Sequence, residues 1–512
     1  MVHQNFIKKL RQQELAKVFS EAKIGFEKES MRVCNSSISQ SPHPESLGSS
    51  LCNRYVTIDF SESQLELITP PMKSGIESFR ALDDIHHYVS QKIQKELIWP
   101  LSMPPSFSEA EIQVGKFGSS HEGQFKSIYR SGLANRYGKS MQAISGFHFN
   151  YSLPSNVWDY AEHKDEKELK NIRSSSYLNM IRNLYKMNWL VLYLFGASPV
   201  ISKNLIEDRG DPFIEIDDEN VYLPYATSLR MSEFGYSNSD RKSIDISLNS
   251  LERYIEDLQW ATSTIEPRYL VYENLKNSQL NPNILQIEAE YYAIARAKSS
   301  LNKNKKLSLD LNDEGVHFIE FRSLDINPFS RVGIDKETIL FFEVFMIFCF
   351  LKFAKEFDKE NMDEIYSNDL KVSTSGRMPD LYLNKDGKKI SITDWGKLIF
   401  EELIAIANQL DEKGENYSEA IQSMRLKLYK PDSTLSGRLL DELVKNKDSY
   451  NQYGKNIAKK YKNYYKVIPP EENGLWGSLE EEALRSLDRQ KVLENITEDS
   501  GITFDAFKKD FF

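Results

Sequence analysis

Ile24–Val33 reads IGFEKESMRV, and this stretch follows the two-residue alternation of a β-strand. In such a strand Glu27 and Glu29 share one face, about 6.5 Å apart, while Phe26 lies on the other face. An acidic face and an apolar face predict a strand that covers a hydrophobic core on one side only. A single acidic pair is also typical of an ordinary solvent-exposed strand, so its meaning depends on whether the arrangement recurs.

The arrangement recurs in four further segments, YVTIDF (55–60), QLELIT (64–69), GFHFNYSL (146–153) and GVHFIEFRSL (315–324). Polar and ionisable side chains on such strands are costly to bury unless a cation or a charged ligand neutralises them. Carboxylates with one imidazole suit Mg²⁺ or Mn²⁺ that holds the phosphates of a nucleotide, so the sequence predicts a phosphoryl-transfer site. With Glu27 and Glu29, the candidate residues are Asp59, Glu66, His148, Asn150, Glu320 and Arg322.

Helical patterns at 76–95, 177–194 and 251–262 separate these strands without a regular strand–helix–strand repeat, which predicts an α+β fold with a largely antiparallel sheet. After about Asp335 the strand pattern nearly disappears, and helices are expected at 341–357, 395–411, 419–428 and 435–462. The length of 512 residues suggests about three domains. Because the dispersed strands supply one shared site, we instead predict a single catalytic unit over 1–512. It has a sheet-bearing core at 24–331 and a mainly helical portion at 335–512.

Composition excludes several classes of protein. The 65 Lys and Arg residues against 75 Asp and Glu give a net charge of −10, which argues against a protein that coats nucleic acid or an anionic membrane.

Three cysteines, Cys34, Cys52 and Cys349, do not resemble the paired framework of a secreted protein. Residues 1–23 lack the apolar region of a signal peptide, and the most apolar stretch, 339–351, is too short to span a bilayer and is expected to be a buried helix. These features favour a cytoplasmic protein.

Two further sequence patterns are similar to ligand-binding motifs but also have ordinary structural explanations. Gly132–Ser140 is similar to a phosphate-binding loop, but it has one residue too many and no clear strand-to-helix context. Lys445–Lys466 is rich in Lys and Tyr, which can indicate nucleic-acid contact. Acidic residues follow at once, so a solvated helix face is the favoured interpretation.

Ten strings between about Gly25 and Phe329 resemble the proteobacterial-type glutamate–cysteine ligases, the γ-glutamylcysteine synthetases. They are IGFEKESMRV, SPHPESLGSSL, TIDFSESQLELITP, WPLSMP, LANRYG, MQAISGFHFNYSLP, LFGASPV, YLPYATSLRMSEFGY, NILQIEAEYYA and IEFRSLDINPF. Beyond them the likeness is thin, and GRMPDL near Gly376 is the clearest remnant. The resemblance implies a glutamine synthetase-like catalytic fold, in which a curved antiparallel sheet forms the active-site funnel and helices flank it.

The resemblance also implies an activity. Such an enzyme uses ATP to join the γ-carboxylate of L-glutamate to the amine of L-cysteine through a γ-glutamyl phosphate, the first step of glutathione synthesis. Glu27, Glu320 and Arg322 are the expected catalytic residues, with Arg322 on the transferring phosphoryl group. An imidazole must be neutral to bind a metal ion, so acid should lower the activity. The resemblance implies two or three Mg²⁺ ions, with Mn²⁺ as an alternative, held by Glu27, Glu29, Asp59, Glu66, His148 and Glu320.

Binding residues follow from the same resemblance. In a chain with 12% aromatic residues, core packing is the ordinary role of any one aromatic, and Arg130 and Arg230 can equally be structural. Segment 292–299 reads YAIARAKS where relatives read YAPIRPKR, so two prolines are missing while Arg296 and Lys298 keep two cations. The substrate-binding candidates are Phe60, Tyr129, Arg130, Leu133, Gln142, Asn150, Tyr236 and Tyr292, and the ATP-binding candidates are Arg230, Arg296 and Arg322.

Two alternatives to this function stay open. One is a carboxylate–amine ligase with a different amine, because pocket residues rather than a metal cage select the acceptor. The other is a non-catalytic regulator that binds metal. We expect a monomer without an obligate protein, nucleic-acid or membrane partner, and glutathione is the candidate feedback inhibitor. The second step of the pathway should need another protein, since no second nucleotide-binding pattern follows Asp335.

Overall fold

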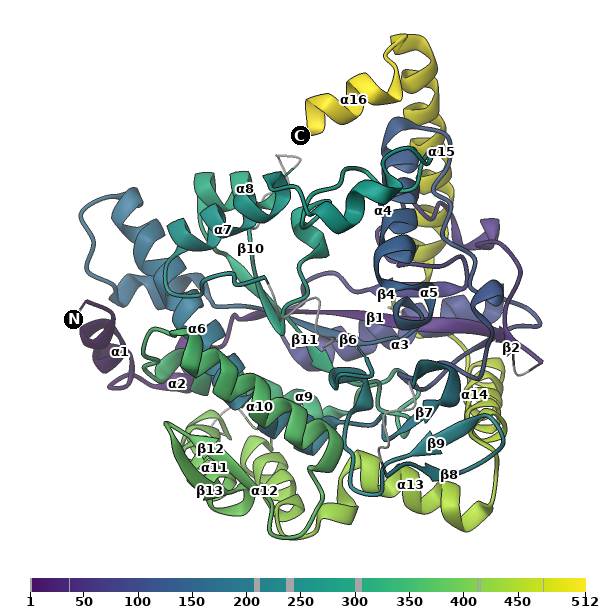
Figure 1. The fold of residues 1–512 in the computed structure, drawn as a ribbon. Coiled ribbons are helices and arrows are strands. Elements are labelled where there is room, and N and C mark those ends of the chain that lie inside the picture. Colours follow the sequence, from purple (N-terminus) through teal and green to yellow (C-terminus); the bar gives the residue numbers. More distant parts are fainter. Residues whose placement is uncertain are drawn as a thin grey trace.

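The computed structural model describes residues 2–35, 37–206, 212–235, 244–299, 306–411, 414, 416–472 and 474–512, and an open antiparallel sheet lies at its centre (Figure 1). The strand order is β10–β11–β6–β1–β4–β3, and two short strands, β2 and β5, also pair with β1. The predicted α+β fold with an antiparallel sheet is confirmed. The strands are β1 (Lys23–Cys34), β2 (Ser37–Ile38), β3 (Val56–Ile58), β4 (Gln64–Ile68), β5 (Leu97–Ile98), β6 (Phe147–Ser152), β10 (Ala295–Lys298) and β11 (Phe318–Leu324).

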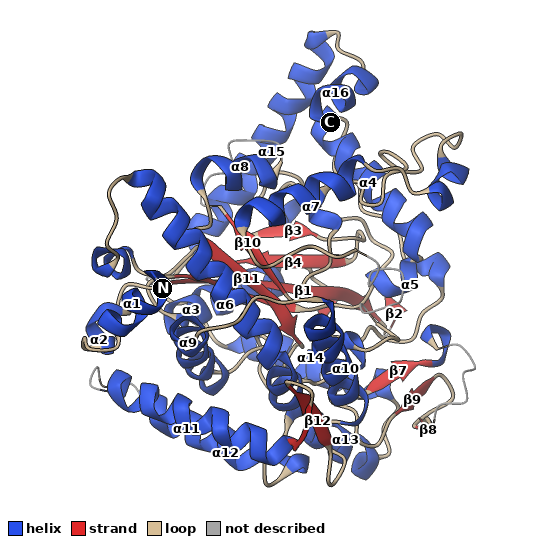
Figure 2. Cartoon of the chain, turned by 60° about the vertical axis from the view of Figure 1, so that its left-hand side comes forward, coloured by secondary structure: helices blue, strands red, loops and turns tan. Residues whose placement is uncertain are grey.

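One face of the sheet is covered by helices, as Figure 2 shows for the strands in the middle of the molecule. Phe26 of β1 and Phe149 of β6 are fully buried, with ring centroids 5.3 Å apart. Phe342 lies 5.2 Å from Phe149 and 5.6 Å from Phe321 of β11, so a continuous aromatic layer joins three strands to one helix. Because alternate residues point to opposite faces, the polar residues between these phenylalanines face away from the core.

Phe342 belongs to α9 (Lys336–Leu351), the buried apolar helix that the sequence predicts. The side chain of Asp335 caps its first turn by accepting a hydrogen bond from the amide of Thr338. In the described residues, no helix has both the length and the apolar character that crossing a membrane requires. Helices α3 (Gly75–Lys92) and α6 (Glu166–Phe195) pack beside α9 on the same face of the sheet.

The chain after Asp335 is mainly helical, but two expected helices have different bounds. The helix expected at 341–357 ends at Leu351, and the one expected at 435–462 is interrupted because Lys447 adopts a left-handed conformation, with φ of 53°. The remaining helices are α1 (Val2–Leu10), α2 (Leu15–Val18), α4 (His121–Tyr137), α5 (Lys139–Gln142), α7 (Leu251–Ser263), α8 (Leu307–Glu314), α10 (Lys359–Ser375), α11 (Ile392–Leu410), α12 (Tyr417–Lys427), α13 (Leu435–Asn446), α14 (Tyr450–Val467), α15 (Trp476–Ser500) and α16 (Phe504–Phe511).

Among the described residues, two small sheets lie outside the central one. A hairpin of β12 (Tyr382–Lys385) and β13 (Lys388–Ser391) interrupts the helical portion. Its turn residues Asp386 and Gly387 both have positive φ, the conformation of a two-residue hairpin turn, and the Asp-Gly pair is a sequence signal for that turn. The second sheet has the order β7 (Val200–Ser202), β9 (Asn220–Tyr222) and β8 (Ile214–Glu215).

The two minor sequence patterns both have helical explanations. Gly132 lies inside α4, so Gly132–Ser140 is not a loop that wraps a phosphate. Lys445–Lys466 falls mostly on α14, whose Tyr450, Tyr453 and Tyr465 are buried while most of its lysines face solvent. The interpretation of this segment as a solvated helix face is therefore confirmed.

Candidate active site

The pairing register of the sheet gathers the predicted metal ligands on the face opposite the aromatic layer. Glu27 of β1 lies directly opposite His148 of β6, and Glu29 lies opposite Glu66 of β4. Glu320 of β11 joins them from the next strand. Directly opposed residues of antiparallel strands point to the same face, so three acids and an imidazole from β1, β4 and β6 meet a fourth acid from β11.

His148 lies at the centre of this group. Its Nδ1 is 3.1 Å from Oε2 of Glu27 and 3.4 Å from Oε1 of Glu320, while its Nε2 is 3.4 Å from Oε1 of Glu29. Glu27, Glu66 and His148 each offer a ligand atom, and these atoms lie within 4.8 Å of one another. We call Glu27, Glu29, Glu66, His148 and Glu320 the acidic cage; its oxygen and imidazole donors fit a divalent cation.

The cage is electrostatically divided. Burial raises the pKa of Glu66 well above its ordinary value, and the charges of Glu27, Asp59 and Glu29 raise it further. Burial also opposes the ionised form of Glu320, but the positive charges of its neighbours, chiefly Lys298, hold its pKa well below the ordinary value. One end of the cage is thus crowded with acids that a cation would stabilise, while the other end already has cationic partners.

Two predicted residues flank the cage in unexpected ways. The strand expected at 55–60 is shorter, because β3 stops at Ile58 and Asp59 follows it. The charge of Asp59 still acts on the cage, since it raises the pKa of both Glu66 and Glu29. Asn150, predicted to bind substrate, donates a hydrogen bond of 2.8 Å from its Nδ2 to Oε1 of Glu27, so it is placed to orient a cage carboxylate.

A cavity of about 90 Å³ adjoins the cage, and we call it the substrate cavity. It collects residues from β1, β6, β11 and α4 together with the segment at 289–296, which lie far apart in the sequence. Tyr236 falls outside the described residues. Of the sequence-predicted residues, the cavity is lined by Glu29, Asp59, Phe60, Tyr129, Arg130, Leu133, Gln142, His148, Arg230, Tyr292, Arg296 and Arg322.

The four predicted arginines have different surroundings. Arg322 donates from Nη1 to Oε1 of Glu320 at 2.5 Å, and this carboxylate keeps the pKa of Arg322 above its ordinary value although burial opposes it. Arg230 is fully buried and its Nε donates to Asp325 at 2.7 Å, which fits the structural role considered for it. Arg130 donates from Nε to the carbonyl of Asp59, and Arg296 donates from Nη2 to the carbonyl of Ala289 at 2.8 Å.

Two residues of this region, Lys298 and Glu290, were not predicted as site residues. The Nζ of Lys298 lies 2.7 Å from Oε2 of Glu320, and the alternation of Arg296 and Lys298 in ARAK was an available signal. Glu290 lines the substrate cavity and forms a buried ion pair with Arg136, with Oε1 and Nη1 3.2 Å apart. Its pairing could not be predicted because it depends on how α4 packs.

The fold and the site together define a class of enzyme. An open antiparallel sheet carries a carboxylate–imidazole cage, and guanidinium groups lie beside it. Metal ligands combined with cationic side chains neutralise the charge that develops when an anionic carboxylate meets a nucleotide phosphate. This is the architecture of a ligase that activates a carboxylate with ATP.

Comparison with known proteins gives the family. The family model described as glutamate–cysteine ligase matches residues 7–372. Glutamate–cysteine ligase from Janthinobacterium sp. (strain Marseille) is 37% identical over 501 residues, which cover 96% of this chain and 94% of that protein. The enzyme of the same name from Vibrio parahaemolyticus is 37% identical over 517 residues, with 97% and 96% covered. The chain belongs to the glutamate–cysteine ligase family, whose reaction begins glutathione biosynthesis.

Solved structures agree with this assignment. The crystal structure of glutamate–cysteine ligase from Francisella tularensis in complex with AMP has a TM-score of 0.88 and 31% identity, and the match covers 96% of this chain and 97% of that one. A bifunctional glutathione synthetase from Pasteurella multocida has a TM-score of 0.72 and 27% identity, with 90% of this chain and 55% of that chain covered. The expectation of an ATP-dependent ligase is confirmed.

Proposed function

We propose that the acidic cage and the substrate cavity together carry out the ligation of L-glutamate to L-cysteine, with the cage holding Mg²⁺. The observation that carries the proposal is the convergence of Glu27, Glu66 and His148, whose ligand atoms lie within 4.8 Å of one another beside the cavity. Burial, and after it the charges of nearby carboxylates, raises the pKa of Glu66, and a divalent cation would favour the ionised form against both effects. Bound Mg²⁺ supplies charge neutralisation for the phosphates of ATP, and Mn²⁺ has the same ligand preferences.

The residues of the chain then have separate roles. Arg322, fixed by Glu320, orients its guanidinium toward the cavity and stabilises the charge of the transferring phosphoryl group. An oxygen of the glutamate γ-carboxylate attacks the γ-phosphorus of ATP, the bond to the β-phosphate oxygen breaks, and ADP leaves. The cysteine amine next attacks the acyl carbon of γ-glutamyl phosphate, and phosphate leaves. Arg296 and Arg230 remain proposed nucleotide contacts, with Arg230 the weaker candidate because Asp325 already engages it.

The amine-binding part of the cavity combines aromatic and polar groups. Phe60 is buried, and Tyr129 and Leu133 come from the same face of α4. This wall suits the small apolar side chain and thiol of cysteine. With Tyr292 and Arg130 they form the proposed acceptor pocket, to which we also assign Tyr236 on the resemblance alone.

Gln142 provides a test of this pocket. Its Nε2 is buried and has no hydrogen-bond partner within the described residues, which suits a donor to the cysteine carboxylate. We expect Gln142→Leu to raise KM for cysteine roughly 10–100-fold, since a hydrogen bond to a charged group contributes about 1.5–3 kcal/mol. Steady-state assays should find KM for ATP within about twofold of wild type, and an unchanged KM for cysteine would reject this role.

Metal binding should depend on pH in a defined direction. Burial and nearby acids raise the pKa of Glu66, so the metal-free cage retains a proton at pH values where an ordinary carboxylate has lost it. Binding of Mg²⁺ must expel that proton. The apparent affinity for Mg²⁺ should therefore rise with pH until Glu66 is ionised, and then level off. Calorimetric titration in two buffers of different ionisation enthalpy should detect proton release; identical heats after correction would contradict it.

An ADP-release assay over a panel of amino acids tests the proposed function. Purified protein with Mg·ATP and glutamate should release ADP rapidly when L-cysteine is added and much more slowly with unrelated amines. Equal turnover with other amines would favour the alternative of a carboxylate–amine ligase with another acceptor. No turnover with any amine, despite metal binding, would favour the regulator.

Three further proposals concern the setting of the reaction. We propose that the chain acts as a monomer. Glutathione contains the γ-glutamylcysteine unit that the site makes, so we propose that it competes at the substrate cavity as a feedback inhibitor. We place the reaction in the cytoplasm, where ATP and reduced cysteine are both available.

A further inference from the structure

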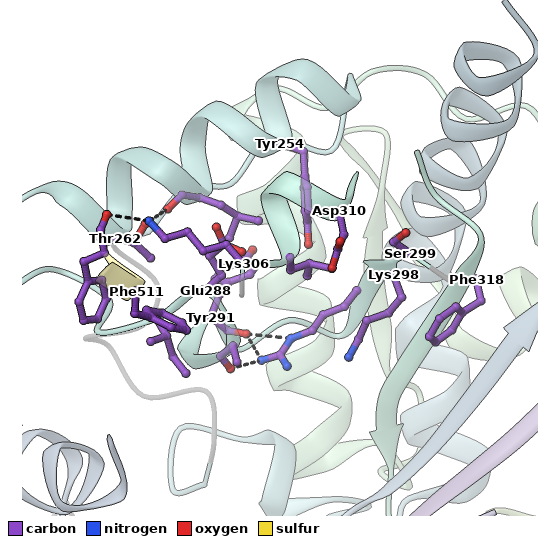
Figure 3. A pocket seen from close by; sticks show the side chains of 16 residues that line it. Tyr254, Thr262, Glu288, Tyr291, Lys298, Ser299, Lys306, Asp310, Phe318 and Phe511 are labelled. Carbon is purple, nitrogen blue, oxygen red and sulfur yellow. Dashed lines mark hydrogen bonds between the residues drawn. The ribbon is translucent and has the colours of Figure 1, made fainter. Parts of the chain in front are cut away.

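A second and larger cavity, of about 480 Å³, lies on the β10 side of the acidic cage (Figure 3). It shares Ala289 and Arg296 with the substrate cavity, so the two are neighbours. Lys298 lines it too, and the Nζ of this residue is 2.7 Å from the cage residue Glu320. One end of the larger cavity therefore borders the site where phosphoryl transfer is proposed.

This cavity extends from the acidic cage toward the last helix, α16. Lys298 and Phe318 lie at one end of it, whereas Phe511 lies at the other, as Figure 3 shows. Arg296, which also lines the cavity, is held in a fixed orientation, because its Nε and Nη2 donate to the carbonyls of Tyr291 and Ala289. The lining also includes the acids Glu288 and Asp310 and the cation Lys306. The match to a nucleotide therefore depends on two features: Lys298 beside the cage, where phosphates would reach, and the ring of Phe511 away from it, where a base would lie.

The last helix of the chain, α16, supplies the end of the larger cavity that lies away from the cage. After α15 has run out along α4, α16 turns back toward the body of the molecule (Figure 1). Phe511 packs on Phe125 of α4 with ring centroids 4.4 Å apart, and Phe507 packs on His121 at 5.0 Å. The same small hydrophobic cluster includes Tyr129, a wall of the substrate cavity. Helix α16 therefore packs on α4 behind the acceptor pocket. Its Phe511 also lines the larger cavity.

This docking is shallow. None of the residues 504–511, all of which the structure describes, is fully buried. Besides the aromatic contacts, the Nζ of Lys306 donates to the carbonyl of Phe512 at 3.0 Å on the exposed rim. Elements with few buried apolar contacts open most easily, so α16 can leave and re-dock without unfolding the sheet.

We propose that α16 is part of the nucleotide site and acts as a strap across it, with the ring of Phe511 forming the wall against which the purine base of ATP packs. The inference rests on the proposed function, since it assumes that the neighbouring cage receives the phosphates. It assigns a binding role to a helix at the far end of the chain, beyond the residues 7–372 that the family model matches.

The test is Phe511→Ala in the full chain. Because stacking of a base on an aromatic ring is sensitive to loss of the ring, we expect KM for ATP to rise about tenfold. KM for glutamate and KM for cysteine should stay within about twofold of wild type, which separates loss of base binding from general damage to the site. Phe511→Tyr keeps the ring and should restore KM for ATP. Phe353→Ala is the control, because this phenylalanine is 56% exposed and lies away from both cavities.

Direct binding makes the outcome independent of turnover. Calorimetry with Mg·ADP should find an affinity about tenfold weaker for Phe511→Ala, whereas Mg·tripolyphosphate, which has no base, should bind both proteins equally. Equal affinity for ADP in the two proteins, or equal weakening for both probes, would overturn the inference. Failure of the proposed function would look different: the wild-type protein would release no ADP with any amino acid, while its affinity for Mg·ADP could still be measured.

Discussion

Glu27→Gln should lower kcat/KM for glutamate by about 10²–10⁴, because it removes a candidate ligand of a metal ion that would contribute several kcal/mol of transition-state charge stabilisation. Glu27 contacts His148 through Oε2 and accepts a hydrogen bond from Asn150 at Oε1, so the substitution removes a candidate metal ligand at the centre of the cage. The size of the side chain is preserved. Initial rates of ADP release at saturating Mg·ATP measure the effect.

Two further substitutions make that result specific. Glu162→Gln changes a glutamate whose side chain is 87% exposed, and it should leave the rate unchanged. Glu66→Gln should also lose activity, yet the metal-free variant should be at least as stable as wild type near neutral pH. The raised pKa of Glu66 means that folding favours its protonated form, so ionisation destabilises the folded cage as pH rises through that pKa. Full activity in either cage variant would contradict the metal-binding role.

Arg322→Lys should lower kcat by about 10³, because catalytic groups that stabilise transferring phosphoryl charge typically contribute 10²–10⁵-fold. Lysine retains the positive charge but not the planar fork, and its single ammonium cannot donate to Glu320 and to a phosphoryl oxygen with the same geometry. Single-turnover measurement of ADP formation isolates the transfer step from product release.

The matched control for Arg322→Lys is Arg253→Lys. The side chain of Arg253 is 62% exposed on α7, and its salt bridges are local to that helix, so the rate should not change. In Arg322→Lys we expect affinity for Mg·ADP within about threefold of wild type, since ADP lacks the transferred group. An equal loss of ADP affinity and kcat would instead assign Arg322 to nucleotide binding alone.

Much of the cage could be predicted because a strand has a strict period of two. Once IGFEKESMRV is recognised as a strand with Phe26 in the core, Glu27 and Glu29 must face away from it, and the same reasoning applies to His148. The alternation of residues within each strand does not, however, predict which residues of neighbouring strands pair. Only the structure places Glu29 opposite Glu66, because register depends on how distant strands meet.

The features that sequence reasoning missed depend on long-range packing or on a local signal that was overlooked. The ion pair of Glu290 with Arg136 joins residues 154 positions apart, and nothing in either local pattern indicates it. The contact of Phe511 with α4 is of the same kind. The hairpin at Asp386 and Gly387, in contrast, had its turn signal in the sequence, within a region predicted to be mainly helical.

The central claim is that one site transfers a phosphoryl group to the γ-carboxylate of glutamate before the amine attacks. Isotope transfer tests it most directly: the enzyme is given L-glutamate with both γ-carboxylate oxygens labelled with ¹⁸O, Mg·ATP and L-cysteine, and the phosphate is analysed by mass spectrometry. The account predicts one ¹⁸O atom in each phosphate released, because the oxygen that attacks phosphorus leaves with it. Phosphate without the label, formed together with γ-glutamylcysteine, would contradict the account.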